Sequence, residues 1–188
     1  MTHILPLGDP RLRERAVPVD DVADPGFRAE SARLRAELDA FRAEHGFGRG
    51  VAAPQLGIGK RFIAINLGQG TRCLVNPGIT WRSEATFTLW DDCMCFPTLL
   101  VKVRRHRSIS LAFQDEEGRP QLWERLPQAE SELLQHECDH LDGVLAIDRA
   151  EGRDGIISRE AFQAQPEHFA NQVDYLIQPT IPATDVRA

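Results

Sequence analysis

The sequence predicts an α+β fold in which mostly antiparallel sheets wrap around one central helix. Three observations lead to this prediction. Short stretches of alternating apolar and polar residues, typical of strands, fill much of the region from residue 60 to residue 125. One longer helical stretch follows at residues 127–143, and its leucines suit a buried position. Runs of strands followed by such a helix are typical of sheets that pack on that helix.

The first half of the chain contains one helix and two strands. Residues 26–45 predict an amphipathic helix whose apolar stripe packs in the core, through Phe27, Leu34, Leu38 and Phe41. Two strands are expected at 60–67 and 71–76, on either side of the turn Gly68-Gln69-Gly70. Pro77-Gly78 is expected to end the second strand.

The second half contains further strands and the central helix. Strands are expected at residues 99–103, 108–114 and 120–125, and residues 115–118 form a hairpin turn between the last two. The central helix has Pro127 in its first turn and Gly143 as a left-handed cap at its end. A short strand at 144–147 follows it.

Length and composition bound the function. The 188 residues predict a single domain over residues 1–165 and a C-terminal tail, 166–188, that is packed or partly disordered. The net charge of −6 argues against direct nucleic-acid binding, and the basic cluster at 104–107 is expected at a solvated strand edge. We expect no membrane span and no secretory signal, and four cysteines without a disulfide framework indicate the cytoplasm.

The stretch Gln135-His136-Glu137-Cys138-Asp139-His140 is typical of a metal site on a helix. His136 and His140 are four residues apart, so they lie on one face and can bind one cation. Glu137 can carry protons for a water bound to that cation. A helix with two surface histidines is the simpler alternative.

A third ligand would decide the chemistry, because a catalytic site of this kind has three protein ligands and one open position. Cys93 and Glu160 are the two candidates. Glu160 would complete the two-histidine, one-carboxylate site of a metalloprotease, whereas Cys93 would complete a mixed thiolate and imidazole site. The residues alone leave this choice open.

A run of small residues, Gly48-Arg49-Gly50-Val51-Ala52-Ala53-Pro54-Gln55, lets the backbone approach a ligand closely. Taken alone, the run is better explained as the turn after a helix that ends near His45-Gly46.

Together the three segments resemble the peptide deformylase family. Its members carry a Gly-x-Gly-x-Ala-Ala-Pro-Gln run, a Glu-Gly-Cys-Leu-Ser run and a Gln-His-Glu-x-Asp-His-Leu-x-Gly run, in this order. The matching positions here are 48–55, 91–95 and 135–143. Residues 4–13 resemble the family's first strand and turn, and residues 144–149 resemble its closing strand.

The resemblance implies hydrolysis of N-formyl groups from N-formylmethionyl peptides or nascent proteins, with release of formate and a free amine. It implies that Cys93, His136 and His140 bind one divalent metal ion. Ferrous iron is expected in the cell, with zinc, nickel or cobalt as alternatives that the ligand types also suit. The implied partner is an N-formylated peptide or nascent chain near the ribosome, and the implied assembly is a monomer or homodimer.

Further roles follow from the same resemblance. Glu137 matches the general base and acid that serves a metal-bound hydroxide. Gln55 and the backbone N–H of Met94 match the two donors to the developing oxyanion. Substrate contacts are expected from the residues that border the cleft, namely Arg49, Gly50, Val51, Glu132 and Leu133.

The chain departs from the family pattern around this cleft. Asp91 and Asp92 replace Glu-Gly before the cysteine, and Cys95 replaces the serine. Arg105 falls where family members pair an arginine with the first carboxylate. Asp92 puts a charge where glycine is usual, which is the best support for a deformylase-shaped protein that has lost catalysis.

Two further charges, Arg49 and Glu132, fall where the family has an apolar pocket that takes methionine. They either point to solvent or pair with each other, or they tune the pocket toward a more polar N-formylated substrate. Three classes therefore stay open: a deformylase, a protease that uses Glu160, and a catalytically impaired metal-binding homologue.

Overall fold

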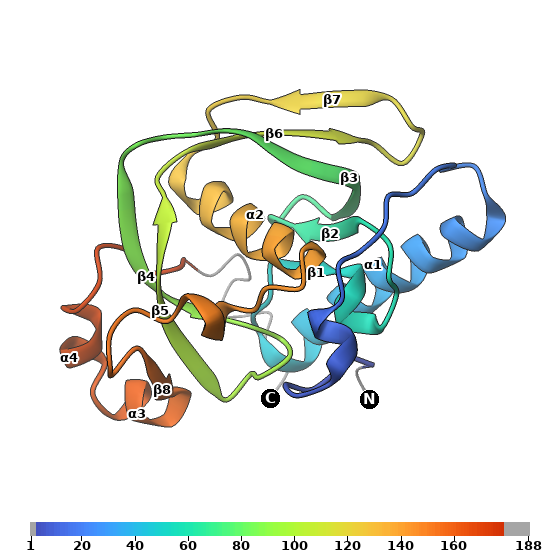
Figure 1. The fold of residues 1–188 in the computed structure, drawn as a ribbon. Coiled ribbons are helices and arrows are strands. Elements are labelled where there is room, and N and C mark those ends of the chain that lie inside the picture. The colour runs from blue at the N-terminus through green and yellow to red at the C-terminus, as the bar shows by residue number, and fades with distance from the viewer. Residues whose placement is uncertain (1–2, 179–188) are drawn as a thin grey trace.

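The protein, as a computed structural model, is described over residues 3–178. Two antiparallel sheets enclose the central helix α2 (Gln128–Leu141), as Figure 1 shows, and the predicted α+β arrangement is confirmed. One sheet has the order β1-β2-β3-β6-β7, and the other has the order β4-β5-β8. The strands of the first are Gly50–Ala52, Phe62–Asn66, Thr71–Arg82, Ile109–Gln114 and Pro120–Trp123. Those of the second are Thr86–Asp92, Leu99–His106 and Ile156–Ser158.

Helix α2 is buried along most of its length because its apolar side chains meet the inner face of the five-stranded sheet. Leu133, Leu134 and Leu141 pack in one core cluster with residues of β2, β3 and β6. Pro127 immediately precedes the helix, and Gly143 follows it with a φ of 73°, the left-handed conformation predicted for this position. The motif histidines are therefore held on a rigid, enclosed element.

Helix α1 (Pro25–His45) packs on the outer side of the same sheet, and Figure 1 shows it beside β2 and β3. The predicted apolar stripe is confirmed, because Phe27, Leu34, Leu38 and Phe41 are all buried in one cluster. Gly46 ends the helix in the left-handed conformation. The run that starts at Gly48 thus leaves α1 and enters the short strand β1.

Two local predictions are wrong. Pro77-Gly78 does not end a strand, because β3 continues to Arg82 through a register shift between Val75 and Gly78. Such an irregularity tolerates a proline, which has no N–H to donate. Residues 144–147 do not form a strand either; Ala146–Arg149 forms the 3-10 turn η3. Asp148 accepts a hydrogen bond from the Leu145 N–H and closes that turn.

The chain contains elements that the periodicity did not reveal. Strand β4 was not expected, and its partner β5 runs three residues past the predicted end, to His106. The short 3-10 turns η1 (Pro10–Arg13) and η2 (Ala53–Leu56) and the helices α3 (Arg159–Ala164) and α4 (Pro166–Ala170) were also missed.

The part of the tail that the structure describes packs on β4. The indole Nε1 of Trp90 donates to the Phe169 carbonyl at 2.9 Å, and Thr88 donates to the Asp174 carboxylate from its N–H and its hydroxyl, both at 2.9 Å. Tyr175 stacks edge-on against Phe87. The rest of the predicted tail, 179–188, lies outside the described residues.

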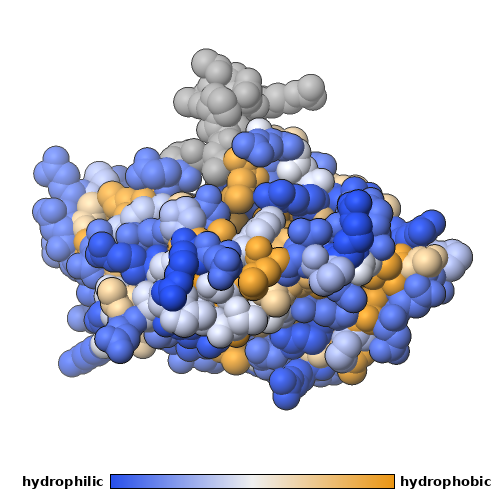
Figure 2. Space-filling view, turned by 90° about the horizontal axis from the view of Figure 1, so that it is seen from above, coloured by the Kyte–Doolittle hydropathy of each residue, from blue (hydrophilic) through white to orange (hydrophobic). Residues whose placement is uncertain are grey.

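The surface is mostly hydrophilic on the face seen from above, where Figure 2 shows apolar residues in small separate groups. The cluster at 104–107 does not form a free basic patch. Arg104 pairs with Glu151, and Arg105 is buried against two carboxylates. Among residues 3–178, none of the helices is both long and apolar enough to span a bilayer.

Candidate metal centre and active-site pocket

Three side chains from two distant segments converge at the end of β4. Cys93 follows that strand, whereas His136 and His140 lie one turn apart on α2. The two Nε2 atoms are 3.1 Å apart, and the Cys93 Sγ lies 3.4 Å from Nε2 of His140. Tetrahedral ligands at metal–nitrogen distances near 2.0 Å and metal–sulfur distances near 2.3 Å stand about 3.3–3.7 Å apart. The spacing of these buried donors therefore fits one cation.

The titration of the donors also fits a cation. The charge of Asp91 outweighs burial and raises the pKa of His136 to about 9, whereas burial and the charge of His136 push the pKa of His140 well below its ordinary value. The two facing imidazole rings of His136 and His140 thus favour one positive charge between them. Burial raises the pKa of the Cys93 thiol, so its ionisation near neutral pH requires a positive charge beside it, which a divalent ion supplies.

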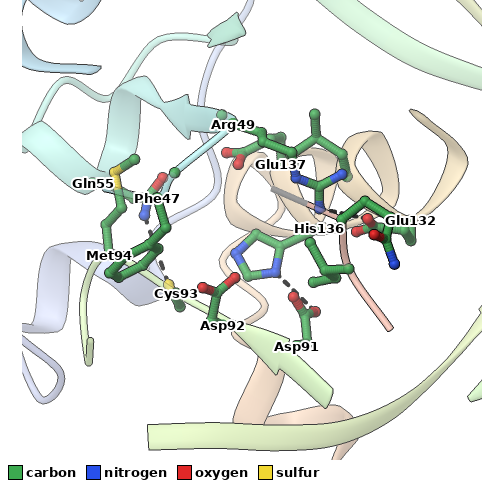
Figure 3. A pocket seen from close by; sticks show the side chains of 15 residues that line it. Phe47, Arg49, Gln55, Asp91, Asp92, Cys93, Met94, Glu132, His136 and Glu137 are labelled. Carbon is green, nitrogen blue, oxygen red and sulfur yellow. Dashed lines mark hydrogen bonds and ion pairs between the residues drawn. The ribbon is translucent and has the colours of Figure 1, made fainter. Parts of the chain in front are cut away.

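Buried charges hold one of the donors, the ring of His136, in place, whereas Nδ1 of His140 has no partner among the described residues. Asp91 accepts from Nδ1 of His136 at 2.9 Å and from Arg105 at 3.1 Å, which is the pairing predicted for this arginine (Figure 3 shows the contact with His136). Arg105 also pairs with Asp139 at 2.5 Å. Burial opposes ionisation of Asp91, but His136 and Arg105 hold its pKa well below the ordinary value. A carboxylate behind a ligand histidine fixes the ring so that Nε2 faces the metal. We call Asp91, Cys93, Arg105, His136 and His140 the metal cradle.

Glu137 lies beside the metal cradle and packs directly on the backbone of Gly50. A Cβ added to Gly50 would come within 2.6 Å of the glutamate Oε1, so only glycine leaves room for this carboxylate. Its Oε2 is buried without a hydrogen-bond partner among the described residues. Burial raises the pKa of Glu137 to about 7. A carboxyl group with this pKa can both accept and return a proton near neutral pH.

Two hydrogen-bond donors face the same space. Gln55, in η2, accepts from the Ala52 N–H at 2.7 Å, which directs its Nε2 toward the thiols of Cys93 at 3.7 Å and Cys95 at 3.5 Å. The Met94 N–H has no acceptor within the described part of the chain. Both donors are thus available to an oxygen that develops negative charge next to the cysteine.

The opposite side of the pocket carries a buried ion pair. Arg49 Nη2 lies 2.5 Å from Glu132 Oε1, and the two side chains are only 10% and 2% exposed. Arg49 also donates to the Ala129 carbonyl at 3.2 Å. The two charges therefore pair with each other, which is one of the alternatives that the sequence left open, and they do not point to solvent. Burial raises the pKa of Glu132 to about 7 although Arg49 acts against it.

The other expected contact residues divide between pocket and core. Gly50 and Leu133 line the cavity, which encloses about 60 Å³, together with Arg49, Glu132, Glu137 and Met94 (Figure 3). Val51, the middle residue of β1, has its side chain fully buried in the core and does not line the cavity. Glu160 is exposed on α3 and takes no part in the group of converging donors.

Asp92 has a partner that the sequence did not suggest. Arg159 donates to its carboxylate at 3.1 Å and lies over the ring of Phe47, with 4.5 Å from Cζ to the ring centroid. Phe47, Ile177 and Gln178 also line the cavity. We call Phe47, Arg49, Asp92, Glu132, Ile177 and Gln178 the recognition wall. Its tail residues could not be found from sequence, since no pattern shows where a tail folds back.

Comparisons with known proteins agree with this arrangement. The model of the family described as polypeptide deformylase matches residues 1–155. A peptide deformylase of Heliobacterium modesticaldum is 36% identical over 150 residues, covering 79% of this chain and 93% of that protein.

Two solved structures extend the likeness to the fold. A peptide deformylase structure from Thermotoga maritima matches with a TM-score of 0.73 and 34% identity, covering 81% of this chain and 99% of that one. A peptide deformylase from Synechococcus elongatus, solved in complex with actinonin, matches with a TM-score of 0.73 and 27% identity, covering 98% and 88%.

Proposed function

The chain belongs to the peptide deformylase family, enzymes that remove N-formyl groups from nascent peptides, and from this premise we propose which of its residues carry the reaction. Cys93, His136 and His140 bind one divalent cation, and Glu137 transfers the protons. Gln55 and the Met94 N–H stabilise the oxyanion. The observation that carries this proposal is the convergence of three buried donors beside a carboxyl group with a pKa of about 7.

The proposed steps use groups that already face one another. When bound, the cation supplies Lewis-acid activation of water and of the formyl oxygen. Glu137 accepts the proton of the attacking water and then returns it to the leaving amine. Gln55 Nε2 and the Met94 N–H donate to the oxygen on which negative charge develops, and each such donor is worth roughly a hundred- to a thousand-fold in rate.

A peptide can be held by strand addition beside this chemistry. Strand β1 is the terminal strand of the five-stranded sheet, and its first residue, Gly50, lines the cavity. An extended substrate would pair its backbone with the outer edge of β1, beside the three converging donors. The formylated end of the peptide would then lie at Glu137.

We propose ferrous iron as the cation in the cell, because one thiolate with two imidazoles suits it as well as zinc, nickel or cobalt. The cytoplasm, whose reducing state preserves an iron–thiolate site, is the proposed location; the cysteines are all free and buried. Nascent chains near the ribosome are the proposed partners, and a monomer or homodimer stays a prediction. We propose one catalytic domain that includes the described tail on β4.

The test is anaerobic purification followed by metal analysis and a formate-release assay with formyl peptides. Glu137→Gln should retain the cation and lose a hundred- to ten-thousand-fold in kcat, because it removes only the proton carrier. Cys93→Ala should lose the cation, while Glu160→Ala should retain both cation and activity.

Other outcomes assign the chain differently. Loss of the cation in Glu160→Ala, with Cys93→Ala unaffected, would point to the protease class. A wild-type protein that holds one cation per chain but releases no formate from any formyl peptide would be an impaired homologue.

A further inference from the structure

The ion pair of Arg49 and Glu132 shares one cavity with the proposed catalytic groups. Both side chains line it together with Cys93, His136 and Glu137. Glu132 lies one helical turn before His136 on α2, so the two side chains face the same side of the helix. Figure 3 shows Arg49 reaching across toward Glu132 above the ring of His136. A group attached close to the reacting nitrogen can therefore lie against this pair.

Burying the ion pair of Arg49 and Glu132 in the cavity wall costs free energy of desolvation. Both charges lose most of their hydration, since the side chains are 10% and 2% exposed. Apolar residues of similar volume often stabilise a protein as well as a buried pair or better. Cohesion between α2 and the segment before β1 therefore does not require these charges, whereas recognition of a polar group does.

The pair retains hydrogen-bonding capacity. Within residues 3–178, the guanidinium of Arg49 makes two contacts, through Nη1 to Ala129 and through Nη2 to Glu132, although it carries five N–H groups. Glu132 accepts through Oε1, which leaves Oε2 for a donor. The amide of Gln178 lines the same cavity. A ligand here meets donors and acceptors side by side.

The charge of the pair narrows the choice of ligand. Arg49 and Glu132 neutralise each other, and Asp92 is neutralised by Arg159. A charged substrate side chain would add one uncompensated charge beside two pairs that are already neutral. An uncharged side chain with both a donor and an acceptor would instead satisfy the guanidinium and the carboxylate together. A carboxamide has this combination.

We propose that Arg49 and Glu132 are specificity-determining residues that select N-formyl compounds whose first side chain is an uncharged hydrogen-bonding group, such as a carboxamide, over an apolar side chain of the same length. This inference rests on the proposed deformylase function and names its substrate class. An apolar side chain leaves the open donors and acceptor of the pair without partners, and such mismatches discriminate strongly.

The test compares two substrates that differ in polarity and little in length, N-formyl-Gln-Ala and N-formyl-Met-Ala. The wild-type enzyme should show a kcat/KM at least about tenfold higher for the glutaminyl substrate. The double variant Arg49→Leu with Glu132→Leu should reverse this preference. The matched control, Glu30→Leu with Lys60→Leu, removes an ion pair of 2.7 Å remote from the cavity and should leave the ratio unchanged.

Binding separates this inference from the proposed reaction. The affinities of both peptides for Glu137→Gln, measured by calorimetry, should favour the glutaminyl peptide by a similar factor. If this binding preference is found but the wild type releases no formate, the pair is supported as a specificity site and the deformylase proposal is rejected. Equal or better binding and turnover of the methionyl peptide by proteins with an intact pair would overturn the inference, even if the double variant does not fold.

Discussion

The metal cradle and the recognition wall face each other across one cavity, and they are built differently. In the metal cradle, a carboxylate and a guanidinium from β4 and β5 brace a histidine of α2, and all three are almost completely buried. In the recognition wall, charges occur in separate pairs, Arg49 with Glu132 and Asp92 with Arg159. The metal cradle lies wholly within the segment that matches the family, whereas part of the recognition wall comes from residues beyond 155.

This difference indicates that the two regions control different properties of the site. The metal cradle couples cation geometry to the core of the fold, so a change there should alter stability and metal affinity together. The recognition wall consists of local pairs, so a change there should alter substrate choice or pH response and leave the cation in place. Single substitutions in the two regions test whether they act separately.

The largest effect is expected at Arg105, which pairs with both Asp91 and Asp139 while only 3% exposed. Arg105→Leu leaves these carboxylates without their common partner and should lower the free energy of unfolding by about 3–5 kcal/mol. Metal affinity should fall about 10- to 100-fold, because Asp91 orients His136. Urea unfolding and competition with a chelator measure the two effects.

The neighbouring Arg104 provides the control. It is exposed and pairs with Glu151 at 2.6 Å, so Arg104→Leu should cost at most about 1 kcal/mol and leave metal affinity unchanged. An Arg105→Leu protein that unfolds more easily but binds the cation as tightly as the wild type would break the proposed link between core and cation.

Gln55 lies at the boundary between the two regions, because its amide approaches the sulfur of Cys93, which we propose as a ligand, while Gln55 itself is proposed as an oxyanion donor. Gln55→Ala should reduce kcat by roughly a hundred- to a thousand-fold and leave the metal content unchanged, as expected for an oxyanion donor. Gln121→Ala, which removes an amide that donates to Asp115 on the far side of the sheet, is the matched control. Loss of the cation in Gln55→Ala would instead assign this side chain to the metal cradle.

Glu132 should give the recognition wall its own pH response. Burial raises its pKa from 4.5 to about 7 in the folded protein. Its contribution to stability is thus fully present below pH 4.5 and is lost as the pH rises through 7, a difference of about 3 kcal/mol. Between pH 5 and pH 8, the free energy of unfolding of the wild type, measured with urea, should fall by about 2–3 kcal/mol more than that of Glu132→Gln. Parallel pH profiles would mean that Arg49 compensates the burial completely.

The same division explains how far the sequence could predict the structure. The motif on α2 and the stripe on α1 were predictable because helical periodicity and end signals are local. The pairing of Arg105 with the carboxylate before Cys93 followed from the resemblance alone, because the strand register sets Asp91 opposite Val101 and Arg105 opposite Phe87. The third ligand needed that resemblance as well, because Cys93 and Glu160 are equivalent candidates by spacing alone.

The unpredicted parts depend on contacts between distant segments. Strand β4 has its pattern blurred because residues 87–91 are all buried: the tail packs Phe169 on Trp90 and binds the outer edge of the strand through Asp174. The 3-10 turn at 146–149 depends on one side-chain contact from Asp148, which hydropathy does not encode. Arg159 as the partner of Asp92 could not be predicted, because 67 residues separate them in the chain.

The smallest effect is expected at Asp92, and it decides whether this residue impairs the enzyme. Asp92 and Arg159 are 26% and 29% exposed, so solvent screens their attraction, and a double-mutant cycle with Asp92→Asn and Arg159→Leu should give a coupling of about 1 kcal/mol or less. Because Arg159 already neutralises the carboxylate, Asp92→Asn alone should change kcat/KM less than about tenfold.

Arg159→Leu tests whether neutralisation of the Asp92 carboxylate matters for turnover. It leaves Asp92 charged beside the cavity and should reduce turnover more than Asp92→Asn does, and the double variant should recover the loss. A large gain of activity in Asp92→Asn would show that the carboxylate acts on the reaction itself. Asp92 would then belong functionally to the metal cradle, and the separation between the two sides of the cavity would fail at the residue where they meet.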